Sequence, residues 1–218
     1  MNPELTYTLP KYQIGCGIVD IMMHTLERYF IPGPKNRMTD EIAEGLLRNV
    51  IENGRIAIKN PTDYDAMSEL MWCGSLSHNN LTGLGRSGKD FSVHKLGHAL
   101  SARFDSAHGA TLSAVWGDWA EYVYESDVER FQHYGRTVWG IQTEEPMQAA
   151  REAIVSTVNY FREIGMPTSL SELGVGIQSD EVLKKLSMDA TMNDTVQLAQ
   201  LRKLKAEDVY RIFVNANH

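Results

Sequence analysis

The sequence lacks three features that would place it at a nucleic acid or a membrane. Its net charge is −7, with 21 Lys and Arg against 28 Asp and Glu, whereas nucleic acids and anionic membranes require clustered positive charge. No apolar run approaches the roughly 20 residues that span a bilayer. The start, MNPELTYTLPKYQ, has neither the basic end nor the apolar core of a signal peptide. We therefore expect a cytoplasmic protein with no nucleic-acid or membrane partner.

Cysteine is also scarce. Cys16 and Cys73 are the only two, and both lie in apolar segments. This pattern favours buried free thiols in a reducing cytosol over a disulfide or a thiolate metal site. The 218 residues, 43% of them hydrophobic, suffice for one large domain with a sizeable core.

No segment alternates with period two over the length of a strand, and no internal repeat is present. Apolar residues recur instead at helical spacing, beginning with Ile14, Ile18 and Met22. We expect an all-α fold forming a single domain over 1–218, after an extended NPELTYTLP segment. The predicted helices run from Lys11 to the break at Pro32, from an N-cap at Thr39 to Ile58, from Thr62 to Leu76, and over 91–104, 109–124, 127–139, 146–164, 179–186 and 206–214.

Three of the seven histidines lie within fifteen residues, in VHKLGHALSARFDSAH. His94 and His98 are four apart and share one face of a helix. His108 follows a short stretch that can end this helix and turn the chain. Two imidazoles on one face suit Zn, Fe, Ni or Co, but the spacing does not say which of the three histidines are ligands.

A second pair, Asp20 and His24, lies on the first predicted helix, in GIVDIMMH. Residues four apart are stacked one turn apart, about 40° around the axis, so both side chains can reach one point. A carboxylate among mainly apolar neighbours is costly to bury unpaired, and a divalent cation would offset that cost. Nitrogen and oxygen ligands without thiolate fit a catalytic Fe²⁺ or Zn²⁺ site with an open position better than a structural zinc site.

The other sequence motifs are weaker evidence for a function. GLGRSG, from Gly83 to Gly88, satisfies the dinucleotide-binding motif G-x-G-x-x-G, and together with Lys89 it satisfies the G-x-x-x-x-G-K part of a P-loop. Both motifs need a preceding strand. A helix is predicted there, and Asp90 stands where a P-loop has Ser or Thr, so we expect a turn that delivers His94. We expect His78 to be a polar residue at the end of a helix, with a place at the border of the pocket as the alternative. An all-helical metal-dependent phosphohydrolase needs an adjacent His-Asp pair, which the sequence lacks.

Several segments resemble the iron-containing (group III) alcohol dehydrogenases, most closely the butanol dehydrogenase-like branch. They are NPELTYTLPKYQIGCGIVDIMMHTLERYF, MWCGSLSHNNLTGLG, VHKLGHALSARFDSAHGATLS, YFREIGMPTSLSELGV and KAEDVYRIF. The resemblance implies the multi-helix metal-binding domain of the dehydroquinate synthase-like fold. It also implies that Asp20, His24, His94 and His108 are the metal ligands, and that His98 lies beside nicotinamide and substrate.

The resemblance implies an enzyme in which Fe²⁺ or Zn²⁺, with Ni²⁺ as a further option, polarises the oxygen of a small alcohol or aldehyde during hydride transfer with NAD(P)H. His98, the expected catalytic residue, would orient the nicotinamide ring or relay the hydroxyl proton. Two positions depart from the branch: Ala99 stands where an acidic residue is common, and Phe91 where Trp is common. Both affect the expected substrate pocket rather than the ligands.

Such enzymes also have an N-terminal α/β domain that binds NAD(P), and this sequence contains no counterpart. We therefore expect the C-terminal helical domain only, with the missing nucleotide-binding domain as its partner and a homodimer as an option. The alternative is a non-catalytic remnant or metal-binding interaction domain.

Overall fold

The computed structural model describes residues 1–33, 36–86, 88 and 90–218, and its regular structure is helical, as predicted. The α-helices are α1 (Lys11–Tyr29), α2 (Arg37–Lys59), α3 (Tyr64–His78), α4 (Ser92–Phe104), α5 (His108–Val123), α6 (Val128–Val138), α7 (Pro146–Glu163), α8 (Asp180–Ala190) and α9 (Ala206–Asn215). Short 3₁₀ helices are η1 (Pro3–Thr6), η2 (Leu81–Gly83) and η3 (Tyr124–Ser126). The sole β feature in these ranges is an isolated bridge between Leu198 and Leu204.

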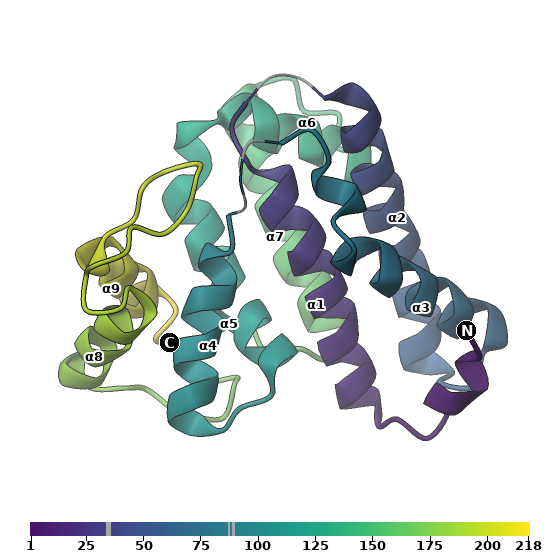
Figure 1. The fold of residues 1–218 in the computed structure, drawn as a ribbon, viewed down its shortest axis with the longest axis horizontal. Helices are drawn as coiled ribbons and strands as arrows, with labels where there is room; N and C mark the ends of the chain where they lie inside the picture. Colours follow the sequence, from purple (N-terminus) through teal and green to yellow (C-terminus); the bar gives the residue numbers. More distant parts are fainter. Residues whose placement is uncertain (34–35, 87, 89) are drawn as a thin grey trace.

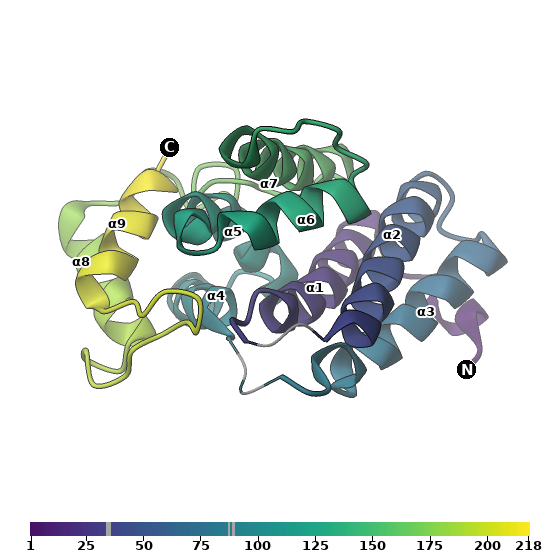
Figure 2. The same ribbon diagram turned by 90° about the horizontal axis from the view of Figure 1, so that it is seen from above.

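Helix α1 lies in the middle of the domain, where it contacts α2 and α3 on one side and α4 and α5 on the other. Helices α8 and α9 pack together at one end of the molecule, and α2 and α3 lie towards the opposite end (Figure 1). Figure 2 shows α6 and α7 lying side by side. A central α1 allows residues on its faces to meet side chains from several other helices.

The core forms from the apolar faces that the sequence pattern predicts. Ile18, Met22 and Leu26 of α1 are at most 1% exposed, and Trp116 and Trp119 of α5 are fully buried. Burying side chains of this size is the main favourable contribution to folding. Both cysteines are buried and free, as expected. None of the helices in the described part of the chain is long and apolar enough to cross a membrane.

The predicted start of the second helix was wrong. Asn36 is the N-cap of α2, and Thr39 lies inside the helix. The Thr39 hydroxyl donates a hydrogen bond to the Leu84 carbonyl oxygen at 3.0 Å, so it is used in a tertiary contact instead of capping the helix. This bond ties α2 to the segment that precedes α4.

Three other local predictions also need correction. The opening segment is the 3₁₀ helix η1 rather than extended, and the Asn2 side chain accepts from the Glu4 backbone N–H at 3.1 Å. The third helix begins at Tyr64 rather than Thr62, because Asp63 is its N-cap and accepts from the Ala66 N–H at 3.0 Å. Helix α8 continues to Ala190, beyond its predicted end at 186.

Candidate metal centre

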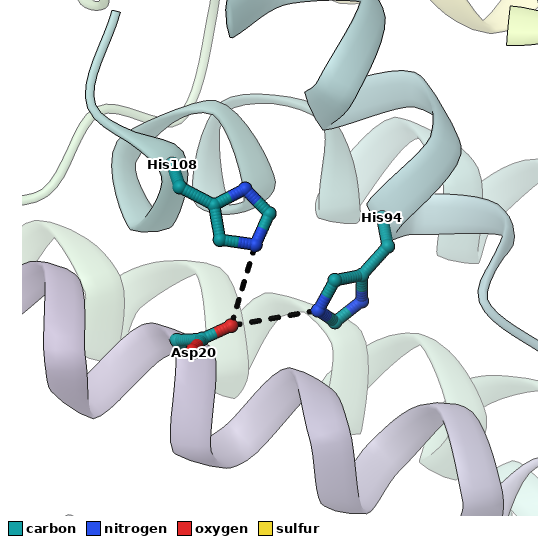
Figure 3. Close-up of side chains that lie close together, drawn as sticks. All are labelled: Asp20, His94 and His108. Carbon is teal, nitrogen blue, oxygen red and sulfur yellow. Dashed lines mark ion pairs between the residues drawn. The ribbon is translucent and has the colours of Figure 1, made fainter.

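Four helices bring Asp20 together with imidazoles. Asp20 lies on α1, His94 near the start of α4, and His108 is the first residue of α5. Figure 3 shows both imidazoles directed at the carboxylate from separate elements. His78, the last residue of α3, reaches the same carboxylate from another side.

The Asp20 carboxylate is the centre of this cluster. Its Oδ1 lies 3.4 Å from His94 Nε2, 3.5 Å from His108 Nε2 and 3.7 Å from His24 Nε2. Its Oδ2 lies 3.3 Å from His78 Nε2. Two trios have ligand atoms within 4.8 Å of one another: Asp20 with His94 and His108, and Asp20 with His24 and His78. Both trios are sets of nitrogen and oxygen donors that suit a divalent transition metal.

Several polar atoms in the cluster are buried and have no hydrogen-bond partner. They are Asp20 Oδ1, His24 Nδ1 and His94 Nε2. The contacts of 3.4 and 3.5 Å to Asp20 Oδ1 are ion-pair distances, and they are longer than good N–H···O bonds. Since buried polar atoms are normally satisfied, the unpaired Asp20 Oδ1 and His94 Nε2, which face each other at 3.4 Å, are a good fit to a cation.

Glu27 sets the orientation of His94. It is 1% exposed, its Oε2 pairs with His94 Nδ1, and its Oε1 accepts from the His94 backbone N–H at 3.2 Å. With Nδ1–H donated to Glu27, the neutral imidazole presents the Nε2 lone pair to the centre. A carboxylate behind a histidine in this way is the usual outer support of a metal-binding histidine.

The charges of the cluster are strongly coupled. Burial opposes ionisation of Asp20, but the nearby imidazoles of His108, His94 and His24 outweigh it and lower the Asp20 pKa. Burial lowers the pKa of His24 to about 4, despite the opposing charge of Asp20. Burial also disfavours a charged His94, but Asp20 and Glu27 raise its pKa to about 9. One histidine therefore stays neutral and ready to ligate, whereas a cation would displace a proton from the other.

A close approach between helices α1 and α5 places His108 beside Asp20. A Cβ atom at Gly109 would lie 2.2 Å from the Cys16 carbonyl oxygen and 2.6 Å from Cys16 Cα. Only glycine fits against that backbone, and Cys16 lies one turn before Asp20. Asp105, with a φ of 54°, ends α4 in the left-handed conformation and turns the chain towards α5. The packing thus explains how His94 and His108 reach one point.

His98 lies at the open side of the cluster. Its side chain is exposed, and its ring centroid lies 5.0 Å from that of His108 and 5.9 Å from that of His94. Burial and the charges of His108 and His94 lower the His98 pKa. Unlike His24 and His94, it lies in neither trio around Asp20. This position suits contact with a bound molecule.

Phe91 packs against two of the imidazoles, and Arg28 packs on Phe91. The Phe91 ring packs edge-on against His94 at 5.0 Å and His24 at 5.5 Å, and the Arg28 guanidinium lies 5.3 Å from the Phe91 centroid. Arg28 also donates to the Ser77 carbonyl oxygen at 2.6 Å. The arginine therefore holds the end of α3 against α1.

The segment expected to deliver His94 is fixed by Asp90, which is 1% exposed. Its Oδ1 accepts from the Ser92 N–H at 3.0 Å and its Oδ2 from the Gln200 N–H at 2.7 Å. Helix α3 and η2 precede the glycine-rich GLGRSG motif, so the strand required by a nucleotide-binding loop is replaced by helix there. Ser87 of this motif and Lys89, which follows it, lie outside the described residues.

The cluster brings together the four predicted ligands, with His98 beside them, and it also contains Glu27 and His78. Glu27 was missed, although it lies three residues after His24 on the same apolar face, which was an available signal. His78 was expected at a helix end, with the border of the pocket as the alternative, and it is both the last residue of α3 and a neighbour of Asp20. His78 lies near Asp20 because α3 packs on α1, and a local sequence pattern does not predict how two helices pack.

Comparison with known proteins gives a consistent assignment. The profile described as "Fe-containing alcohol dehydrogenase family, C-terminal" matches residues 15–217. The chain is 40% identical over 215 residues to NADH-dependent butanol dehydrogenase A of Clostridium acetobutylicum, covering 98% of this chain and 54% of that protein. It is 35% identical over 193 residues to the NADPH-dependent aldehyde reductase YqhD of Escherichia coli, covering 85% of this chain and 48% of that protein.

Solved structures agree with the sequence matches. The crystal structure of NADH-dependent butanol dehydrogenase A from Thermotoga maritima aligns with a TM-score of 0.92 at 30% identity, over 99% of this chain and 55% of that one. The substrate- and cofactor-free YqhD structure from E. coli aligns with a TM-score of 0.91 at 30% identity, over 98% of this chain and 55% of that one. The chain thus spans about half the length of the relatives it matches.

Proposed function

Because the chain belongs to the iron-containing alcohol dehydrogenase family, and comprises its C-terminal helical domain, we propose that it is the metal-binding catalytic domain of an NAD(P)-dependent alcohol dehydrogenase or aldehyde reductase. The metal ligands in this proposal are Asp20, His24, His94 and His108. The nicotinamide cofactor would be bound by a separate α/β domain, which is the partner this domain requires.

One observation carries the proposal: buried, unpaired atoms of Asp20 and His94 converge on one point. If the cluster were only a structural hydrogen-bond network, these atoms should have partners, because a buried donor or acceptor without a hydrogen bond costs about 1–3 kcal/mol. The contact between Glu27 and His94 Nδ1 also supports metal binding, because it leaves His94 Nε2 free to bind an ion. The names of the relatives, butanol dehydrogenase and aldehyde reductase, suggest the substrate class.

A divalent ion bound there, Fe²⁺, Zn²⁺ or Ni²⁺, would supply a Lewis acid that polarises the oxygen of an alcohol or aldehyde. The residues of the chain would do the rest. Glu27 and Phe91 hold the imidazole rings in place, and His98 at the open side would orient the nicotinamide or relay the hydroxyl proton. Hydride chemistry itself belongs to the nicotinamide.

The experiment that tests the proposal is metal loading of the 218-residue chain. Purified chain is stripped with a chelator, reloaded anaerobically with Fe²⁺ or with Zn²⁺, and analysed for metal content. We expect one ion per chain. A chain that keeps no ion after removal of excess metal would overturn the assignment.

A second candidate function is a metal-binding interaction domain without catalysis of its own, since the four proposed ligands all lie within this helical domain. Fluorescence titration with NADPH separates this case from a self-sufficient enzyme. If the loaded chain binds NADPH and reduces butanal, the chain is sufficient by itself. If it binds metal but no NADPH, catalysis requires the separate nucleotide-binding domain.

A further inference from the structure

His78 stands apart from the ligand set named so far, yet it lies against the same carboxylate. Its Nε2 is 3.3 Å from Asp20 Oδ2, and its ring centroid is 3.9 Å from that of His24. The side chain is 44% exposed, so it lies on the open edge of the cluster. Its distance to Asp20 is the shortest of the four histidines that surround the carboxylate.

The hydrogen bonds of His78 determine which ring nitrogen carries the proton. Nδ1 lies 2.8 Å from the Gly74 carbonyl oxygen, which can only accept, so Nδ1 is the protonated nitrogen. The neighbouring Ser77 hydroxyl donates to the same carbonyl at 3.0 Å, and its oxygen lies 2.9 Å from Nδ1, so it can accept from the same N–H. In the neutral ring Nε2 therefore presents its lone pair to Asp20 Oδ2. Two acceptors facing each other at 3.3 Å repel unless a cation lies between them.

This arrangement has the same form as that of His94. In both histidines Nδ1 is bound to an oxygen of the protein, Glu27 for His94 and Gly74 for His78, and Nε2 faces Asp20. Fixing one ring nitrogen in order to aim the other is how proteins orient metal-binding histidines. The match suggests that both rings serve the same purpose.

The position of His78 is built into the fold. Arg28 donates to the carbonyl oxygen of Ser77 at 2.6 Å and to Asn80 Oδ1 at 3.2 Å, on either side of His78. Since Arg28 lies one turn after His24 on α1, this clamp fixes the end of α3 at the level of the cluster. His78 is thus held close to the centre and is not free to swing away from it with a mobile helix end.

From these contacts we infer that His78 is a fifth protein ligand of the same single cation, binding through Nε2 beside Asp20 Oδ2. The inference rests on the metal-binding function proposed above. Five ligands from the chain leave one position of an octahedral ion for a substrate oxygen. Such a set suits Fe²⁺ or Co²⁺ better than Zn²⁺, which is usually held by three or four protein ligands in a tetrahedral site.

The test compares Co²⁺ and Zn²⁺ binding by the 218-residue chain and by two variants, His78→Ala and His78→Gln. Affinity is measured by competition with a chelator, stoichiometry by elemental analysis, and the ligand field by the visible absorption of bound Co²⁺. We expect both variants to lose Co²⁺ affinity on the order of ten-fold or more, to change the Co²⁺ spectrum, and to lose less affinity for Zn²⁺.

The matched control is His133→Ala. His133 is also a half-exposed helix residue, with Nε2 3.0 Å from a carboxylate oxygen of Glu44, and its loss should leave metal binding unchanged. Circular dichroism checks that the variants are folded. Unchanged Co²⁺ affinity and spectrum in both His78 variants, or two ions per parent chain, would overturn the inference and leave the proposed function standing. A parent chain that binds no Co²⁺ would overturn both.

Discussion

Two carboxylates of this domain are enclosed by cationic or ionisable groups, and they differ in how their oxygens are satisfied. Asp40 on α2 accepts from Arg130 Nη2 at 2.6 Å and Nη1 at 2.9 Å, and it also pairs with Arg86. Asp20 on α1 instead faces imidazole nitrogens at 3.3 to 3.7 Å, and its Oδ1 has no hydrogen-bond partner.

The difference distinguishes a structural ion pair from a ligand site. Guanidinium groups carry a permanent charge and cannot release a proton to make way for a metal. Imidazoles can be neutral and offer a lone pair. The carboxylate of Asp40 is therefore satisfied by its two arginines, whereas Asp20 Oδ1 keeps an unpaired position that the proposed cation would fill. Lowered pKa values occur in both, so a perturbed pKa alone does not identify a functional site.

The largest effect on the Asp20 cluster should come from His94→Ala. We expect the metal content to fall from one ion per chain to near zero, and the activity of the proposed dehydrogenase to be abolished, because the most buried ligand and its Glu27 support are lost together. Elemental analysis after gel filtration measures it, with His133→Ala as control. Retained metal would remove His94 from the ligand set.

Asp40→Asn should have the reverse effect: lost stability with metal binding kept. Removing one partner of a buried pair leaves Arg130 and Arg86 uncompensated, and we expect a loss of about 3 kcal/mol in the free energy of unfolding. Urea denaturation of the metal-free chain measures it. Asp180→Asn, which disrupts an exposed pair with Lys184, is the control and should cause no measurable loss.

The Asp40 pair also predicts a pH dependence. Burial opposes ionisation of Asp40, but Arg130 and Arg86 outweigh it and lower its pKa. Because the folded pKa is below the unfolded value of about 4, the stability from this pair is complete above that value. It is lost as the pH falls through the folded pKa. The difference in stability between parent and Asp40→Asn should therefore shrink at low pH, and a constant difference would contradict the prediction.

A smaller effect is expected from Gly109→Ala. The new Cβ would meet the Cys16 backbone at 2.2 Å, forcing α5 away from α1 and His108 away from Asp20. We expect about 1–3 kcal/mol of lost stability together with weaker metal binding, measured by urea denaturation and chelator competition. Gly17→Ala is the control, since a Cβ there meets nothing within 4 Å. That variant should keep full metal affinity and gain up to about 1 kcal/mol.

The sequence predicted the helices well because each apolar face repeats with the period of the helix that it buries. Helix boundaries were less predictable where a distant contact intervenes, as when Thr39 bonds to Leu84. Asp20 and His24 share a helix face, so their proximity could be derived locally. His94 and His108 as a pair came from the family resemblance, and the Gly109 contact that brings His108 to Asp20 involves residues more than 90 positions apart.

The smallest effect on metal binding should come from His98→Ala, which tests where the ligand site ends and the substrate side begins. His98 is exposed and lies outside both trios around Asp20, so we expect one ion per chain to remain, with Co²⁺ affinity unchanged. In the proposed dehydrogenase, turnover with NAD(P)H and butanal should fall, because a group at the open side would act on the bound molecule rather than on the ion. Elemental analysis and steady-state kinetics measure the two quantities. Loss of metal in this variant would make His98 a ligand and would extend the unsatisfied cluster one turn further along α4.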